Sequence, residues 1–284
     1  MAAALWKVVD MTIDFARGGM IMGVLNVTPD SFSDGSAFFE SRRALEQAVR
    51  MVDEGAEIID VGGESTRPGA NAVPEEEEIR RVIPVIEKMR SAGHKVLISI
   101  DTSKAAVASA ALEAGANIIN DVTGGRGDAK MMTLAAERGA GFIIMHMQGT
   151  PRTMQKDPHY DDVVAEVVEF FRQQYGRALE CGIDPMAIAF DPGIGFGKTL
   201  KHNLELLANL PQLRIADRPL VVGVSRKSSL GKLIGSTEVS DRLAPTIAFT
   251  ALLRERGAAV IRVHDVKPNV AALRSTEALL ASAK

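Results

Sequence analysis

The chain of 284 residues contains one cysteine, no long apolar run and no excess of basic over acidic residues. Cys181 alone cannot form an internal disulfide, which favours a reducing compartment. It falls near the end of a helical pattern, so we expect a buried small hydrophobic residue and not a nucleophile. No apolar run approaches the roughly 20 residues of a membrane span, and the segment 2–5 is too short for a signal-peptide core. These absences predict a cytoplasmic protein with no membrane partner.

A large excess of charge of either sign is also lacking. The formal charge of −3 and the isoelectric point near 6.0 give no general attraction to nucleic acid. Apolar residues make up 46% of the chain, which is enough to bury a large core. We therefore expect one domain over residues 1–284, with a short N-terminal extension to about residue 18.

Several common catalytic motifs are missing. The five histidines are scattered and the first expected strand has no His-x-His pair, which argues against a zinc hydrolase. The glycine-rich segment 193–199 has Pro192 where a Walker A loop needs glycine, and it lacks the spacing of a dinucleotide site. No Ser-His-Asp arrangement is evident. Lys227 suits the Schiff-base lysine of an aldolase, but Arg262 and His264 nearby are more simply explained as an anion-binding pair.

Short apolar runs alternate with helical patterns along the chain. The first expected strand, 20–25, ends at Asn26, and a polar loop follows it. The other expected strands are 57–61, 95–100, 117–120, 141–145, 187–190, 219–224 and 258–263. The expected helices are 41–54, one beginning at residue 74, 104–114, 129–138, 161–181, one that includes 204–210, 241–256 and 267–283. This alternation predicts a single-domain α/β protein, a (β/α)8 TIM barrel, with a doubly wound open sheet as the alternative because periodicity does not show closure.

Polar side chains end most of the expected strands, where the active sites of such barrels lie. Taken singly, an aspartate there more often caps the next helix, and a histidine is more often structural. Arg262 and His264 are two apart on one strand and point to the same side, where two such groups suit a phosphate or carboxylate. The collective pattern favours an active site made of Asn26, Asp60, Asp101, Asn120, His146, Asp191, Ser225 with Lys227, and Arg262 with His264.

Eight segments, in order along nearly the whole chain, carry a resemblance to a known family. They are GVLNVTPDSFSDG at 23–35, DVGGESTRPG at 60–69, SIDT at 99–102, INDV at 119–122, MHM at 145–147, DPGIGFGK at 191–198, SRKS at 225–228 and RVHDV at 262–266. One such segment is weak evidence, but together they are highly specific. The sequence resembles the dihydropteroate synthases of the pterin-binding barrel family.

This resemblance implies a transferase of folate biosynthesis. The reaction condenses 6-hydroxymethyl-7,8-dihydropterin diphosphate with 4-aminobenzoate, giving 7,8-dihydropteroate and diphosphate. The resemblance also implies that the carbon–oxygen bond breaks before the arylamine attacks, that Mg2+ is the cofactor, and that sulfonamides compete with 4-aminobenzoate. The expected partners are these small molecules and a second copy of the chain in a homodimer.

The resemblance also implies roles for individual residues. The pterin is expected to bind Asp101, Asn120, Asp191 and Lys227, between the apolar side chains of Met145 and Phe196. The diphosphate is expected at Asn26, Arg262 and His264, with Asn26 as the Mg2+ ligand. The catalytic residues would be Asp101, which stabilises a pterin cation, with Lys227, Arg262 and His264. The residues expected around 4-aminobenzoate and in the closing loops are Phe32, Asp34, Thr66, Arg67, Pro68 and Ser228.

Two other functions remain open. A folate-dependent methyltransferase on the same barrel would share Asp101, Asn120 and Asp191, but it needs neither Arg262 and His264 for diphosphate nor the Ser-Thr-Arg-Pro loop. A non-catalytic pterin-binding homologue would bind the diphosphate substrate without turnover. A suitable side chain stands at every implicated position, which argues against the second of these.

Overall fold

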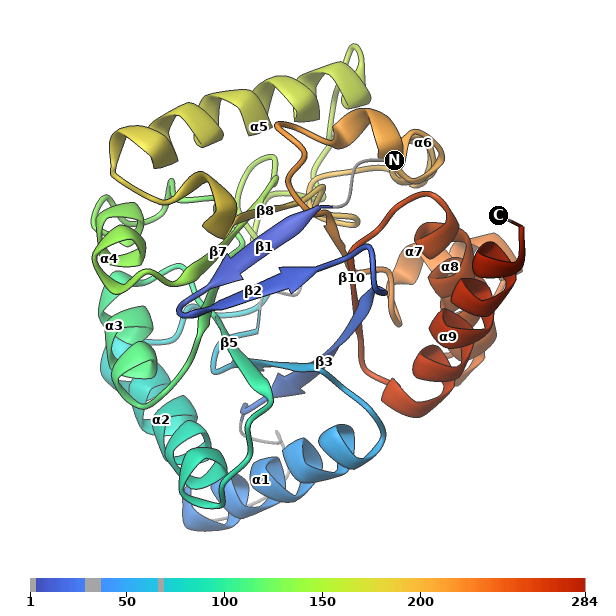
Figure 1. Ribbon diagram of the computed structural model, residues 1–284. Helices are drawn as coiled ribbons and strands as arrows, with labels where there is room; N and C mark the ends of the chain where they lie inside the picture. The colour runs from blue at the N-terminus through green and yellow to red at the C-terminus, as the bar shows by residue number, and fades with distance from the viewer. Residues whose placement is uncertain (1–3, 29–36, 66–68, 284) are drawn as a thin grey trace.

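Parallel strands and helices alternate in the computed structural model, which describes residues 4–28, 37–65 and 69–283 (Figure 1). Eight of the described strands form one sheet in the order β8-β7-β6-β5-β4-β3-β10-β9, and every neighbouring pair is parallel. Their bounds are β3 Met20–Asn26, β4 Ile58–Gly62, β5 Leu97–Asp101, β6 Ile118–Asp121, β7 Gly141–Met145, β8 Ile188–Asp191, β9 Val221–Val222 and β10 Val260–Val263.

The sheet closes between its two end strands, β8 and β9. Phe190 forms an isolated parallel bridge with Leu220, and the Phe190 backbone N–H donates to the carbonyl oxygen of Pro219 at 3.0 Å. This contact leaves no open sheet edge between β8 and β9. The predicted (β/α)8 barrel is therefore confirmed, and the open doubly wound sheet is excluded.

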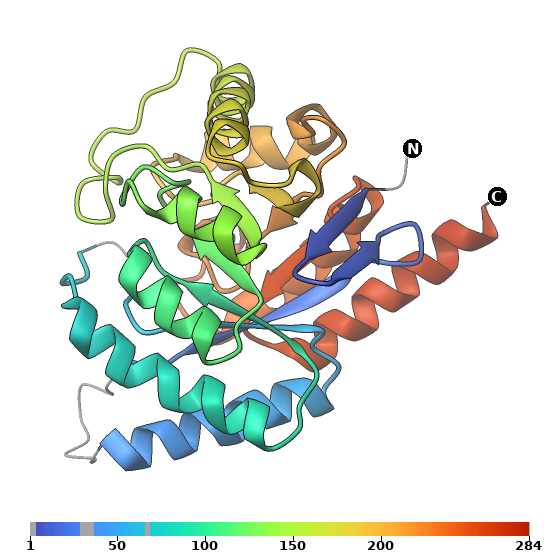
Figure 2. The ribbon, with the colours of Figure 1, turned by 60° about the vertical axis from the view of Figure 1, so that its left-hand side comes forward.

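Helices surround the barrel on its outside (Figures 1 and 2). Within the described residues they are α1 Ala37–Asp53, α2 Glu75–Ser91, α3 Ala105–Glu113, α4 Met131–Arg138, α5 Val163–Glu180, α6 Leu200–Ala208, α7 Ser228–Ile234, α8 Leu243–Glu255 and α9 Val266–Ser282. Helix α7 was not predicted, because seven residues are too few to show a helical period. No helix in the described ranges has the length and apolar character to cross a membrane.

Residues 5–14 of the predicted N-terminal extension form an ordered plug. Strands β1, Leu5–Val8, and β2, Met11–Asp14, form an antiparallel hairpin that lies across one end of the barrel (Figure 1). Trp6 of this hairpin is fully buried, and its indole N–H donates to the carbonyl oxygen of Ala187 at 2.8 Å. Its apolar cluster contains inward-facing residues from the start of the strands, including Met22, Ile58 and Ile118. The hairpin therefore closes the N-terminal end of the barrel.

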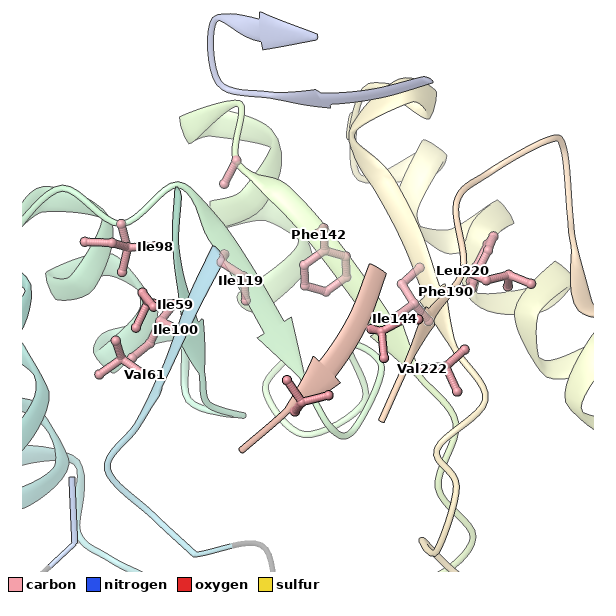
Figure 3. Close-up of a cluster of buried hydrophobic side chains, with 14 of the residues drawn as sticks. Ile59, Val61, Ile98, Ile100, Ile119, Phe142, Ile144, Phe190, Leu220 and Val222 are labelled. Carbon is pink, nitrogen blue, oxygen red and sulfur yellow. The ribbon is translucent and has the colours of Figure 1, made fainter. Parts of the chain in front are cut away.

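A second apolar layer lies between the strands and the outer helices. Figure 3 shows outward-facing strand residues such as Ile59, Val61, Ile98 and Ile100, which belong to a cluster that also includes buried helix residues. Successive side chains of a strand point to opposite faces of the sheet. The strand residues between these outward-facing ones therefore point into the barrel. The strand register thus decides which polar residues face the barrel interior.

Two local predictions were wrong or incomplete. Cys181 is exposed and not buried, because α5 ends at Glu180 and Cys181 caps it at the surface. The seventh barrel strand has two ladder residues in place of the expected 219–224. Pro219 has no backbone N–H to donate to a ladder, so the chain reaches the sheet through a single bridge before β9 begins.

Candidate active site

The inward faces of the barrel strands carry apolar residues at one end and polar residues at the other. Along β4, β6 and β8 the plug-facing residues Ile58, Ile118 and Ala189 are each followed two positions later by Asp60, Asn120 and Asp191. Side chains two apart on a strand share a face, so these polar groups lie inside the barrel above the plug. The β5–β6 register also pairs Asp101 directly with Asn120. The topology therefore brings the sequence-predicted pterin residues to one mouth of the barrel.

Arg262 connects two of these carboxylates. Its Nε donates to Oδ2 of Asp60 at 2.6 Å, and its Nη2 donates to Oδ2 of Asp101 at 2.7 Å. Asn120 donates from Nδ2 to the same Asp60 oxygen at 3.1 Å. Asp60 is fully buried, and Asp101 and Asn120 are nearly so. One network thus spans β4, β5, β6 and β10.

This network sets the electrostatics of Asp101. Burial raises the pKa of Asp101 to about 7, with Arg262 opposing the shift and Asp60 and Glu78 adding to it. Burial alone would lower the pKa of Arg262, but Asp60 and Asp101 raise it above its ordinary value. Oδ1 of Asp101 is buried and has no hydrogen-bond partner among the described residues. Asp101 therefore has one oxygen held by Arg262 and a second without a partner among those residues.

Asp191 and Lys227 form the opposite side of the mouth. Oδ1 of Asp191 accepts from the backbone N–H of Gly193 at 2.7 Å, and Nζ of Lys227 donates to the carbonyl oxygen of Ile194. Burial lowers the pKa of Lys227 to about 8, although Asp191 works against the shift, and burial raises the pKa of Asp191, with Lys227 opposing. Nζ of Lys227 also lies 4.8 Å from the centre of the Phe196 ring. This side of the mouth therefore combines a hydrogen-bond acceptor, Asp191, a donor, Lys227, and the aromatic ring of Phe196.

The two predicted apolar walls lie together. Met145 belongs to a buried cluster with three other apolar side chains, against which Phe196 packs. The cluster is completed by Val122, Met147 and Met154. A cavity of about 120 Å³ is lined by Asp101, by the apolar residues Val122 and Met147, and by polar residues that include Glu64 and Glu78. The mouth thus places apolar side chains beside its polar groups, as a flat heteroaromatic ligand requires.

The remaining predicted residues lie around this mouth. The backbone N–H of His264 donates to Oγ of Ser225 at 3.1 Å, and its Nδ1 lies 3.1 Å from the same oxygen. Ser228 is exposed at the first turn of α7, and Asn26 is exposed at the end of β3. Phe32, Asp34, Thr66, Arg67 and Pro68 lie outside the described residues.

Two polar residues of this region had no specific predicted role. Asp60 was included in the expected active site only as one of the strand-end polar residues, yet it accepts hydrogen bonds from both Arg262 and Asn120. Lys198 was noted only within a motif, yet it is buried beside His146. The inward orientation of Asp60 could have been predicted from the sequence, because Asp60 lies two residues after Ile58 on the same strand and shares its face. The lysine gave no such signal, because its position depends on the path of a loop.

No group of three or more His, Cys, Asp or Glu side chains in the described ranges is arranged to hold a metal ion. Asn26 has an amide oxygen, a hard ligand that suits Mg2+. Mg2+ is often held by one or two protein oxygens together with substrate phosphates. The donor set fits an ion that enters with a diphosphate.

Comparisons with known proteins agree with this geometry. Residues 22–264 match the family model described as pterin binding enzyme. A dihydropteroate synthase of Escherichia coli is 47% identical over 262 residues, covering 92% of each chain. A probable bifunctional folylpolyglutamate synthase/dihydropteroate synthase of Haloferax volcanii is 50% identical over 90% of this chain, which spans 30% of that longer protein.

A solved structure shares the whole architecture. The crystal structure of Burkholderia cenocepacia dihydropteroate synthase complexed with 7,8-dihydropteroate is 40% identical, with a TM-score of 0.90. The match covers 100% of this chain and 99% of that one. The chain therefore belongs to the pterin-binding enzymes and, within them, to the dihydropteroate synthases, which are transferases of folate biosynthesis.

Proposed function

We propose that the barrel mouth described above condenses 6-hydroxymethyl-7,8-dihydropterin diphosphate with 4-aminobenzoate to form 7,8-dihydropteroate and diphosphate. The observation that carries this proposal is the convergence of four strand residues, Asp101, Asn120, Asp191 and Arg262, with Lys227 from the segment before α7, beside an apolar cluster. A pterin presents a row of donors and acceptors on a flat ring, which matches such a mixed surface.

Pterin recognition is assigned to both sides of the mouth. Asp191 keeps one oxygen on the Gly193 N–H, and its carboxylate would accept from the amino and N–H edge of the ring. Asn120 and Lys227 would complete the polar contacts. Met145 and Phe196 would pack against the ring faces, since both belong to the apolar group in the mouth.

Asp101 is proposed to stabilise the reacting pterin. When the carbon–oxygen bond to diphosphate breaks, positive charge develops on the pterin, and a fixed carboxylate lowers the energy of that state. The amino nitrogen of 4-aminobenzoate then forms the new carbon–nitrogen bond and loses a proton. Arg262 holds Asp101 in place before substrate binds, so little reorganisation is needed during the reaction.

The leaving diphosphate is assigned to Asn26, Arg262 and His264. Mg2+ would be held by the Asn26 amide and the diphosphate oxygens, and it would screen the charge of the leaving group. Arg262 is already paired with Asp60 and Asp101, so its contribution to diphosphate binding would come from the part of the guanidinium that those carboxylates do not occupy. His264 is half-buried next to Ser225.

The 4-aminobenzoate site is proposed at the edge of the mouth. Its carboxylate would bind at Ser228, where α7 begins. Phe32 and Pro68 would contact its ring, and Asp34, Thr66 and Arg67 would order the closed loops. Closure would exclude water, which otherwise competes with the arylamine for the pterin cation.

We further propose that residues 1–284 form one pterin-binding domain that acts in the cytoplasm as a homodimer. Among the described residues, seven of the ten exposed large hydrophobic side chains fall between positions 233 and 280, which supports an interface at the last helices. They are Leu233, Ile234, Val239, Leu243, Leu252, Leu279 and Leu280. Analytical ultracentrifugation tests the dimer, and a monomer at micromolar concentration would contradict it.

Diphosphate release by the purified protein tests the reaction. With pterin diphosphate and Mg2+ present, release should depend on 4-aminobenzoate and should match dihydropteroate formed. Lys227→Met should reduce both strongly. Tight pterin binding without release would indicate a non-catalytic homologue, and transfer of a folate methyl group to a corrinoid protein would indicate the methyltransferase.

A further inference from the structure

Lys198 is a buried lysine next to the proposed pterin site, and it does not line that site. Its side chain is 2% exposed. Its amino group donates to the carbonyl oxygens of Phe196 at 3.0 Å, Gly193 at 3.1 Å and His146 at 3.3 Å. It also lies 2.9 Å from Nδ1 of His146. One amino group thus links the loop after β8 to the residue that follows β7.

The two backbone segments that Lys198 joins are unusually close. A Cβ added to Gly193 would lie 1.9 Å from the carbonyl oxygen of His146, and one added to Gly197 would lie 2.5 Å from that of Gln148. Both glycines have positive φ, 64° and 63°, which favours glycine in any case. Carbonyl oxygens therefore crowd into a small space, and buried carbonyls need donors. Lys198 supplies hydrogen bonds to three of them.

The loop that Lys198 holds also carries two contacts of the mouth. The carbonyl oxygen of Ile194 accepts from Lys227, and the ring of Phe196 lies under the same amino group. Gly193 donates to Asp191. A shift of this loop would therefore move Phe196 and Lys227 and would disturb the acceptor geometry of Asp191. Each of these three residues is assigned to the pterin and none to 4-aminobenzoate.

We propose that Lys198 is a positioning residue that fixes the pterin half of the mouth, by binding the 193–196 loop to the end of β7. This inference rests on the proposed function. Lys198 is not assigned a step in the chemistry, because its amino group is surrounded by backbone acceptors and His146. Burial and the nearby Lys198 lower the pKa of His146 to about 2, so the ring is neutral and its Nδ1 can accept a hydrogen bond from the Lys198 amino group.

The test compares Lys198→Met and Lys198→Gln with Lys201→Met. Lys201 is exposed in the first turn of α6, so its replacement controls for loss of a lysine close by. Steady-state kinetics gives kcat and separate KM values for the two substrates, and calorimetry in the absence of 4-aminobenzoate gives the affinity for the pterin diphosphate. Thermal unfolding reports whether each variant is folded.

We expect Lys198→Met to raise the KM for pterin diphosphate about tenfold or more, because several hydrogen bonds of the loop are lost. The KM for 4-aminobenzoate should change less than about twofold, since no hydrogen bond within the described residues joins Ser228 to this loop. Lys198→Gln, which leaves one amide donor, should show a smaller rise, and Lys201→Met should match the parent protein. A general structural defect would instead lower the amount of active enzyme and leave both KM values unchanged.

Three results would overturn the proposal. They are an unchanged pterin KM in a folded Lys198→Met protein, equal changes in both KM values, and failure of both Lys198 variants to fold, which would make Lys198 a folding residue. If the parent protein forms no dihydropteroate, the proposed function fails. The calorimetric comparison of pterin affinity still decides the role of Lys198 in that case.

Discussion

Arg262 holds Asp101 from a strand that is not its neighbour in the sheet. The 2.7 Å hydrogen bond joins β10 to β5, and the 2.6 Å bond to Asp60 joins β10 to β4. Two aspartates, Asp60 and Asp101, share the single guanidinium of Arg262. This cluster therefore has one cation for two carboxyl groups before any diphosphate binds. This arrangement orders the mouth in the absence of substrate, because each member is fixed by another strand.

Arg262→Met should destabilise the protein by about 3–5 kcal/mol, because it leaves two buried carboxylates without their cation. Adding Asp60→Asn removes one of those charges and should recover part of the loss without recovering activity. Urea unfolding followed by far-UV circular dichroism gives both values. Unchanged unfolding midpoints in Arg262→Met would show that the two ion pairs contribute nothing to stability.

The pH dependence of kcat/KM should be bell-shaped. Asp101, with a pKa of about 7, must lose its proton to stabilise a cation, so activity should rise as pH increases through that value. Lys227, with a pKa of about 8, must keep its proton to bind the pterin, so activity should fall above that pH. Rates measured in constant-ionic-strength buffers test this.

Two variants separate the limbs of that profile. Glu78→Gln should move the acidic limb to lower pH, because the charge of Glu78 contributes to raising the pKa of Asp101. Lys227→Met should lose the alkaline limb while keeping some residual rate. A profile without either limb would argue against these assignments.

Asp191→Asn should raise the pterin KM roughly 10- to 100-fold, since hydrogen bonds to charged groups contribute about 1.5–3 kcal/mol. Asp121→Asn is the matched control. Asp121 is a buried aspartate on the same barrel, but its oxygens accept from Thr123 and Gly125 within a loop. That variant should lose stability with little change in KM. Equal KM effects in the two variants would contradict the assignment.

Gly193→Ala and Gly235→Ala should differ in cost. Both glycines have positive φ, 64° and 68°, so alanine costs about 1–2 kcal/mol at either position. A Cβ at Gly235 meets no atom within 4 Å, whereas one at Gly193 collides with the backbone of His146. Gly193→Ala should therefore lower the unfolding free energy further and also weaken pterin binding. Chemical denaturation of the pair measures the difference.

The sequence predicted the barrel because alternating patterns are local. Strand ends such as Asp101 and Asp191 could be located within one or two residues, and the barrel then brings them together. The pairing of Arg262 with Asp60 could not be predicted, since these residues are 202 positions apart and their contact depends on strand order and closure. The exposure of Cys181 was missed because a shift of one residue at a helix end changes its surroundings.

Lys198 illustrates a second limit. Its motif marked the segment as important, but the acceptors of its amino group include a residue 52 positions away and carbonyls of its own loop. Backbone acceptors have no residue type, so no sequence pattern records them. Positioning residues of this kind can be identified only from the three-dimensional structure.

The single tryptophan of the chain, Trp6, lies in the hairpin that closes the barrel at the end opposite the mouth. An indole there is shielded from solvent and distant from any ligand bound at the strand ends. Its emission should stay blue-shifted and unchanged when substrates bind, and it should shift to the red when the plug opens. The protein thus contains an intrinsic fluorophore whose signal reports loss of the fold separately from occupancy of the active site.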